Sequence, residues 1–251
     1  MNHTPQIHED WIVPDWPVAP HVRALITTRA GGVSSAPYDT FNLGFATQDK
    51  PSAVTENRRR LRALLPEEPR WLKQVHGARV VSAESVDGRP EADASVAREP
   101  GSVCAILIAD CLPVLFSDRA GDIVAAAHAG WRGLAAGVLD NTVAAISEAG
   151  IAPEDILAYI GPGIGPAAFE VGEEVRAAYV DYDAGAAAAF TPHAPGKWLA
   201  DLPRLARRAL ARCGVSEVYG GALCTYSDAA RFYSYRRNKT TGRMAALIWR
   251  E

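Results

Sequence analysis

Two histidines and one cysteine of this sequence lie at the ends of apolar runs, where side chains of reactive type often gather. His76 lies in QVHG, Cys111 in IADCLPVLF and His128 in AAAHAGWRG. Catalytic zinc takes three protein ligands and leaves a fourth position for water, so three such residues at three strand ends fit a catalytic metal site. Neutral imidazole and thiolate both suit zinc.

The spacing of these three residues is not a local metal-binding motif. His76 and Cys111 are far apart in the sequence, and a cysteine beside an apolar strand more often fills the core than binds a metal. The residues alone therefore leave two interpretations open, a zinc site and a packed cysteine.

Two further segments have features of anion-binding sites. GWRG at 130–133 opens a predicted helix, and exposed N–H groups at a helix N-terminus attract anions. SYRRNKTTGR at 234–243 is rich in arginine and lysine, and a solvated surface is the alternative for both segments. The turn GPGIGP at 161–166 lacks the lysine of a phosphate-binding P-loop and does not match GxGxxG.

Composition indicates a globular protein that acts on a small molecule. The chain has 251 residues, of which 48% are hydrophobic, and a net charge of -3. This is enough apolar material for a core, and the charge gives no basic surface for nucleic acid. The polar N-terminus and the short apolar runs predict neither a signal peptide nor a membrane span. We therefore expect a cytoplasmic protein with reduced cysteines.

The pattern of apolar residues predicts one α+β domain over 21–251, preceded by a proline-rich N-terminal arm over 1–20. Helices are expected at 51–65, 133–148, 170–182 and 197–213. Strands are expected at 22–29, 79–83, 103–109, 112–116, 123–127, 156–160, 215–219 and 244–249.

The segments TTRAGGVSS, KQVHG, ADCLPVLF, HAGWRG and TTGRMAALIW closely resemble the YfiH family over nearly the whole chain. That family has carried the labels multicopper polyphenol oxidase, laccase-domain protein and purine nucleoside phosphorylase. The resemblance implies a layered α/β/β/α sandwich related to the cytotoxic necrotizing factor deamidases. It also implies that His76, Cys111 and His128 are both the metal ligands and the catalytic centre.

Among the labels of the family, the resemblance favours purine nucleoside chemistry. A laccase needs a blue copper site and a separate histidine-rich cluster, whereas this chain has four histidines outside the arm and no HxH pair. We therefore expect a zinc-dependent purine nucleoside phosphorylase that acts on adenosine, inosine and methylthioadenosine and also deaminates adenosine. Zinc explains the deamination because it lowers the pKa of bound water.

Arg29 and Asn42 are the expected contacts to phosphate and to ribose or base, because they border the long loop after the first strand. A solvated strand end is the alternative for Arg29, and a turn residue is the alternative for Asn42.

Three alternative functions stay open. Cys111 and a histidine could form the thiolate pair of a cysteine-type amidase that edits cell-wall precursor peptides. Copper could replace zinc in a polyphenol oxidase. A non-catalytic binding protein ranks last. The sequence sets neither the preferred nucleoside nor the oligomeric state.

Overall fold

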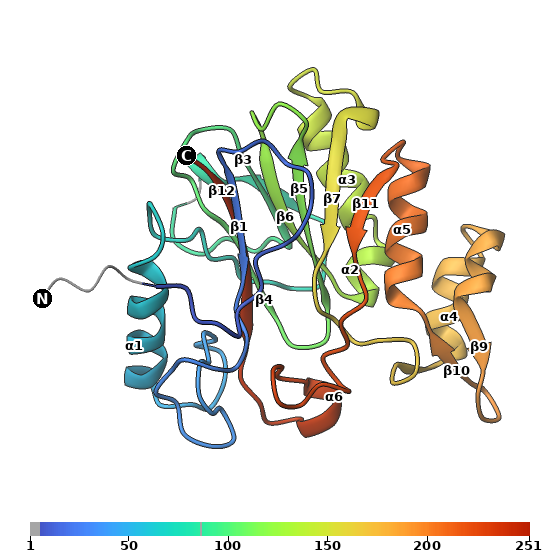
Figure 1. Ribbon diagram of the computed structural model, residues 1–251. Helices are drawn as coiled ribbons and strands as arrows, with labels where there is room; N and C mark the ends of the chain where they lie inside the picture. The colour runs from blue at the N-terminus through green and yellow to red at the C-terminus, as the bar shows by residue number, and fades with distance from the viewer. Residues whose placement is uncertain (1–5, 86) are drawn as a thin grey trace, which may run out of the picture.

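Two β-sheets face each other, and helices cover the outer side of each sheet (Figure 1). This computed structural model describes residues 6–85 and 87–251. The order of layers is helix, sheet, sheet, helix, and the α/β/β/α architecture expected from the sequence is confirmed. Within the described ranges, every helix is too short or too polar to cross a membrane.

The larger sheet has six strands in the order β11-β7-β5-β6-β3-β2. Its central strands β5 and β6 are buried at every position, because both faces of the sheet are covered. They form an antiparallel pair in which Pro113 lies opposite His128, so the start of β5 and the end of β6 meet at one edge. The strands are β2 (Val80–Ser82), β3 (Ala94–Ala97), β5 (Leu112–Asp118), β6 (Val124–Ala129), β7 (Ile156–Ile160) and β11 (Glu217–Gly220).

The second sheet is antiparallel and packs on the first. It consists of β1 (Val22–Ile26), β12 (Met244–Arg250) and β4 (Cys104–Ile108). Apolar residues such as Ile106 and Ile248 fill the space between the sheets. Leu61 of α1 (Pro51–Arg62) packs on the outer face, so this helix forms the first layer.

Helices on the far side cover the remaining face of the six-stranded sheet. A small sheet of three short strands, in the order β8-β10-β9, extends beside them. The helices are α2 (Trp131–Ala135), α3 (Val138–Ser147), α4 (Glu173–Val180) and α5 (Leu202–Arg212), with the short α6 (Tyr235–Asn238) at the lower end. The small strands are β8 (Glu170–Gly172), β9 (Phe190–Pro192) and β10 (Lys197–Ala200). Short 3₁₀ helices occupy Ala83–Ser85, Pro153–Asp155 and Ala184–Ala189.

Three predicted helices were wrong at their boundaries. Residues 170–172 and 197–200 are strands, and α5 begins only at Leu202, where the Asp201 side chain accepts a hydrogen bond from the N–H of Arg204. The predicted helix 133–148 is two helices, because Gly137 takes a φ of 88° between them. The sequence reasoning also missed β3, which is buried at every position and so lacks an alternating pattern.

The second half of the predicted N-terminal arm lies against the three-stranded sheet, beside β1. Ile12 exchanges two backbone hydrogen bonds with Ile26, and Trp11 and Trp16 are buried. Residues 1–5 of the arm lie outside the described residues. The division of the chain at residue 20 stays a prediction.

Candidate metal centre and active site

His76, Cys111 and His128 come together at the edge where β5 begins and β6 ends. One donor atom from each lies within 4.8 Å of the others. The Cys111 Sγ and His76 Nε2 atoms are 3.8 Å apart, and the two imidazole rings meet edge to face with centroids 4.8 Å apart. The structure thus brings together the three residues that the sequence singled out.

The donor set fits a small, moderately soft metal ion. Ligand bonds of about 2.1 Å to nitrogen and about 2.3 Å to sulfur in a tetrahedron would place those two atoms about 3.6 Å apart. The observed distance of 3.8 Å between sulfur and nitrogen is close to this value. Three side chains in this arrangement can hold one metal ion and leave a position for a further ligand.

Asp93, which the sequence reasoning missed, holds this centre from behind. Its fully buried carboxylate accepts hydrogen bonds from the backbone N–H groups of Val75, His76 and Gly77, at 2.7–3.1 Å. The same carboxylate lies 2.8 Å from Nδ1 of His128. A carboxylate on one ring nitrogen fixes the orientation of a metal-binding histidine and leaves the other nitrogen for the metal. The one signal in the sequence was an acidic residue next to a short apolar run.

The electrostatics of the centre favour charged side chains. Burial raises the pKa of the Asp93 carboxyl, but hydrogen bonds from His128 and Gly77 outweigh burial and hold this pKa below its usual range. Burial also raises the pKa of the Cys111 thiol, but the neighbouring His128 and His76 lower it to a net value below the ordinary one. Burial lowers the pKa of His128, and Cys111 and Asp93 raise it further than burial lowers it. Cys111 is therefore poised as a thiolate, the form of cysteine that binds metals.

Asp110 fixes the backbone next to Cys111 and so fixes where Cys111 lies in the site. Its φ of 92° is rare for a residue other than glycine, and a stable contact network has to hold it. The carboxylate accepts hydrogen bonds from the Thr225 hydroxyl and from the N–H of Arg236, each at 2.6 Å. The carbonyl of Asp110 accepts a third, from the N–H of Ile164 at 2.8 Å. Three distant segments are thus joined at the residue before Cys111.

Gly130 allows the ligands to approach the chain closely. A Cβ atom at this position would lie 2.8 Å from Sγ of Cys111 and 3.0 Å from Cδ2 of His76. The first distance is too short for a real contact and the second is tighter than most, so a side chain here would displace Cys111 and press on His76. The backbone of Gly130 has ordinary angles, and space rather than conformational freedom therefore requires glycine here.

A cavity of about 640 Å³ opens directly over the three residues, within the usual size range of small-molecule sites. Aromatic and aliphatic side chains, among them Trp131, Phe169 and Leu107, form part of its wall. Five cationic side chains also line it: Lys73, Arg89, Arg132, Arg236 and Arg243. The Asp110 carboxylate, which lines it too, is already hydrogen-bonded through both oxygens. Such a wall suits a ligand with an aromatic part and an anionic part.

Arg29 and Asn42, the predicted substrate contacts, lie outside the set of residues that line this cavity. Arg29 forms an ion pair with Asp39 at 3.0 Å and stacks over the Tyr233 ring. Asn42 is fully buried, and its side-chain oxygen accepts hydrogen bonds from the N–H groups of Gly44 and Arg243. These contacts give Asn42 a role in shaping the wall, while direct substrate contact by either residue stays a prediction.

The two segments predicted to bind anions contribute unequally to the cavity. Arg132 of 130–133 lines it, but the helix that follows is only five residues long. Of the run 234–243, Arg236 and Arg243 line the cavity. Arg237 instead donates to the carbonyls of Thr225 and Tyr226, each at 2.7 Å, and so holds the loop.

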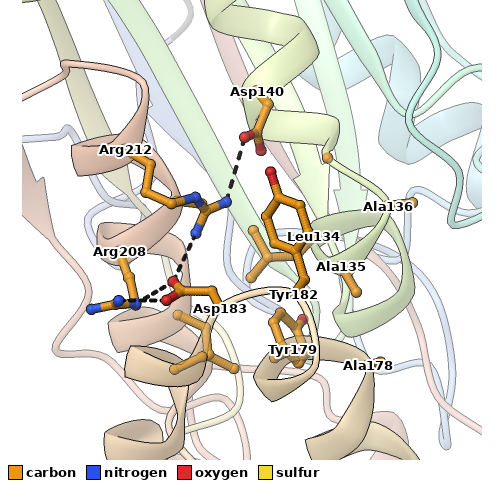
Figure 2. A pocket seen from close by; sticks show the side chains of 14 residues that line it. Leu134, Ala135, Ala136, Asp140, Ala178, Tyr179, Tyr182, Asp183, Arg208 and Arg212 are labelled. Atoms are coloured by element: carbon orange, nitrogen blue, oxygen red, sulfur yellow. Dashed lines mark hydrogen bonds and ion pairs between the residues drawn. The ribbon is translucent and has the colours of Figure 1, made fainter.

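A second cavity of about 260 Å³ lies between α2, α3, α4 and α5 (Figure 2). Its charged side chains neutralise one another: Arg212 lies 3.4 Å from both Asp140 and Asp183, and Arg208 also pairs with Asp183. This cavity contains none of the three metal-type ligands. The larger cavity is therefore the candidate active site.

Comparison with known proteins identifies the family and agrees with this fold. The family described as multi-copper polyphenol oxidoreductase laccase matches residues 23–251, and the chain belongs to that family. The resemblance to the YfiH family is thereby confirmed. The chain is 55% identical over 240 residues to a Pseudomonas aeruginosa protein named as a purine nucleoside phosphorylase, with 95% of this chain and 98% of that protein covered. It is 54% identical over 244 residues to the Escherichia coli protein named purine nucleoside phosphorylase YfiH, with 95% and 98% covered.

Solved structures give the same result for the fold. A Neisseria meningitidis protein superposes with a TM-score of 0.93 at 49% identity, covering 97% of this chain and all of that chain. YlmD from Geobacillus stearothermophilus superposes with a TM-score of 0.88 at 32% identity, covering 98% of both chains.

Proposed function

We propose that this protein is a zinc-dependent purine nucleoside phosphorylase that accepts adenosine, inosine and methylthioadenosine and also deaminates adenosine. The observation that carries the proposal is the cluster of His76, Cys111 and His128 in a cavity with both aromatic and cationic walls. Relatives more than half identical over nearly the whole chain, named as purine nucleoside phosphorylases, support the same activity.

Different parts of the cavity wall suit the two substrates, the nucleoside and the phosphate. Trp131 and Phe169 offer apolar aromatic surface to a purine, and the cationic side chains offer charge to a phosphate. In phosphorolysis, a phosphate oxygen bonds to the anomeric carbon of the ribose while the glycosidic C–N bond breaks. The purine leaves with the electron pair of that bond and takes up a proton. Cationic residues stabilise the phosphate while it attacks.

His76, Cys111 and His128 would hold the zinc, with Asp93 fixing His128. When bound, the metal supplies Lewis-acid chemistry and lowers the pKa of water, which suits the hydrolytic loss of ammonia from adenosine. The protein's own part is to place the purine beside the three ligands and to limit the access of bulk water. The partly enclosing wall of Trp131, Phe169 and Leu107 serves that purpose.

The proposal is tested by product analysis with adenosine in the presence and absence of phosphate. Phosphate-dependent formation of adenine and ribose 1-phosphate, together with slower formation of inosine, supports it. Adenine and free ribose formed equally well without phosphate would mean that the protein is a hydrolase.

A cysteine-type amidase is the second candidate function. It is favoured by the 3.8 Å distance between Cys111 Sγ and His76 Nε2 and by the lowered pKa of the Cys111 thiol. A thiolate bound to zinc is a poor nucleophile, so the two functions differ in their response to metal. If the protein is a phosphorylase, removal of the metal should abolish its activity. If it is an amidase, removal of the metal should free the Cys111 thiolate and raise its activity.

The family description as a multi-copper laccase fits the site less well. Among residues 6–85 and 87–251, the one cluster of metal-type ligands is the group described above. His21 contacts the carbonyl of Gly121, and His193 pairs with Glu170. A laccase needs a second, multinuclear copper cluster, so we propose one metal ion per chain. We also propose a cytoplasmic location, where the thiols stay reduced.

A further inference from the structure

The cationic side chains around the cavity differ in the partners that they already have within the protein or in solvent. Lys73 is paired with Glu91 at 2.7 Å. Arg89 and Arg132 are exposed to solvent, which weakens their attraction for an anion. Arg236 donates through Nη1 to the carbonyl of Glu170. Lys73 is therefore neutralised, Arg89 and Arg132 are hydrated, and Arg236 is stacked over the Phe169 ring as well as anchored through one nitrogen.

Arg243 is also anchored through one nitrogen, but it is more deeply buried and its whole side chain is fixed. Its Nη1 donates to the carbonyls of Thr241 and Gly242 at 3.0 and 2.9 Å. Among the described residues, these are the hydrogen bonds of its guanidinium, and Nε and Nη2 take part in none. Neither of those two atoms is among the buried polar atoms without a partner. One edge of the guanidinium thus anchors the side chain, and the other edge is left for a ligand in the cavity.

The stem and backbone of Arg243 are also fixed. Its backbone N–H donates to the Asn42 side chain at 2.8 Å, and its carbonyl accepts from the N–H of Leu43 at 2.9 Å. The stem lies on Gly44, where a Cβ atom would be only 2.7 Å from Cγ of Arg243. A guanidinium fixed in advance loses little conformational entropy when it binds an anion.

The surroundings of Arg243 call for a negative charge in the cavity. Burial lowers the pKa of Arg243, and the neighbouring Cys111 and Asp110 oppose this effect. Cys111 would be bound to the metal, and both Asp110 oxygens are hydrogen-bonded elsewhere. A cation that is mostly removed from water and lacks its own carboxylate is stabilised by an anionic ligand.

We propose that Arg243 binds the inorganic phosphate beside the metal centre, through the edge formed by Nε and Nη2. The planar fork of arginine matches two oxygens of a phosphate, and such bidentate pairs are strong. This inference rests on the proposed phosphorylase function and names the residue that recognises the second substrate of that reaction.

The test compares Arg243→Met and Arg243→Lys with the wild-type protein. With adenosine as substrate, the KM for phosphate should rise by about ten- to a hundredfold in Arg243→Met, while the KM for adenosine changes little. Arg243→Lys keeps the charge but loses the fork, so its KM for phosphate should fall between the two. If Arg243→Met does not fold, the lysine variant decides.

Direct binding gives a second readout that does not depend on turnover. Inorganic phosphate should raise the thermal midpoint of the wild-type protein relative to chloride at equal ionic strength, and this rise should be lost in Arg243→Met. Arg58→Met is the matched control, because Arg58 is also largely buried, against the Trp71 ring, and does not line the cavity. This variant should keep the response to phosphate.

The outcomes separate this inference from the proposed function. Wild-type phosphorolysis with an unchanged KM for phosphate in both Arg243 variants would overturn the inference and leave the function in place. A phosphate-induced rise that depends on Arg243, in a protein without phosphorolysis, would support the site and overturn the function. If AMP raises the thermal midpoint in an Arg243-dependent way and free phosphate does not, the residue binds a nucleotide rather than inorganic phosphate. That result would overturn the inference.

Discussion

The Asp93 carboxylate lies 2.8 Å from Nδ1 of His128 and binds the turn that carries His76 through three backbone N–H groups. One buried side chain thus sets the positions of two of the three candidate ligands. Cys111 is set separately, by the contacts of Asp110. The geometry of the centre is therefore determined by residues that would not touch the metal.

Asp93→Asn should weaken metal binding by about 10- to 100-fold, because an amide cannot accept from three N–H groups and orient His128 as a carboxylate does. The measurement is competition for zinc with a chelator of known affinity. Asp118→Asn is the control: Asp118 is also a buried carboxylate and accepts N–H bonds from Ala120 and Ile123, at the opposite end of β5. Equal losses in the two variants would show that the effect is a general loss of stability.

The same carboxylate predicts a pH dependence of stability in the metal-free protein. The pKa of Asp93 is lowered in the folded state, so its contribution to the free energy of unfolding is present above the unfolded pKa of about 3.9 and is lost as pH falls. The difference in unfolding free energy between wild type and Asp93→Asn should therefore shrink when pH is lowered from about 5.5 to about 3. Urea titrations across this range measure it. A difference that stays constant would mean that Asp93 keeps its ordinary pKa.

Cys111→Ala should abolish metal binding and nucleoside turnover together and leave the fold intact. The substitution removes the thiolate and leaves two imidazoles, which hold zinc poorly. Cys104→Ala is the internal control, because Cys104 is fully buried in β4 between the sheets. It should lower stability by about 1 kcal/mol and keep its metal. Full metal occupancy in Cys111→Ala would exclude this cysteine as a ligand.

Gly130→Ala should lower metal affinity without unfolding the protein, since the new Cβ would press on Cys111 and His76. The backbone angles at Gly130 accept alanine, so the damage is confined to the site. Gly77→Ala is a matched change in the neighbouring turn, where the nearest atom would lie at an ordinary 3.5 Å. Metal titrations of both variants decide the point, and equal affinities would mean that the site adapts to the extra methyl group.

Much of this architecture could be predicted from the sequence. The apolar runs of β5 and β6 predicted strands, and the ends of such runs indicated His76, Cys111 and His128 as candidate ligands. The order of layers came from the resemblance to the YfiH family. Asp93 could not be found in the same way, because it is adjacent to the centre only through the pairing of β3 with β6. Arg29 and Asn42 were expected to contact substrate because they border the long loop. The hydrogen bond from Arg243 to Asn42, which places Asn42 behind the cavity wall, forms only because the start of β12 lies beside the loop at 42–49. Such relationships arise from tertiary pairing, which local patterns do not encode.

The account is tested most directly by the metal content and phosphate dependence of the same preparation. Protein purified without added metal should contain about one zinc per chain, and with adenosine it should release ribose 1-phosphate only when phosphate is present. Several copper ions per chain with a blue absorption band, or release of adenine that does not depend on phosphate, would contradict the account.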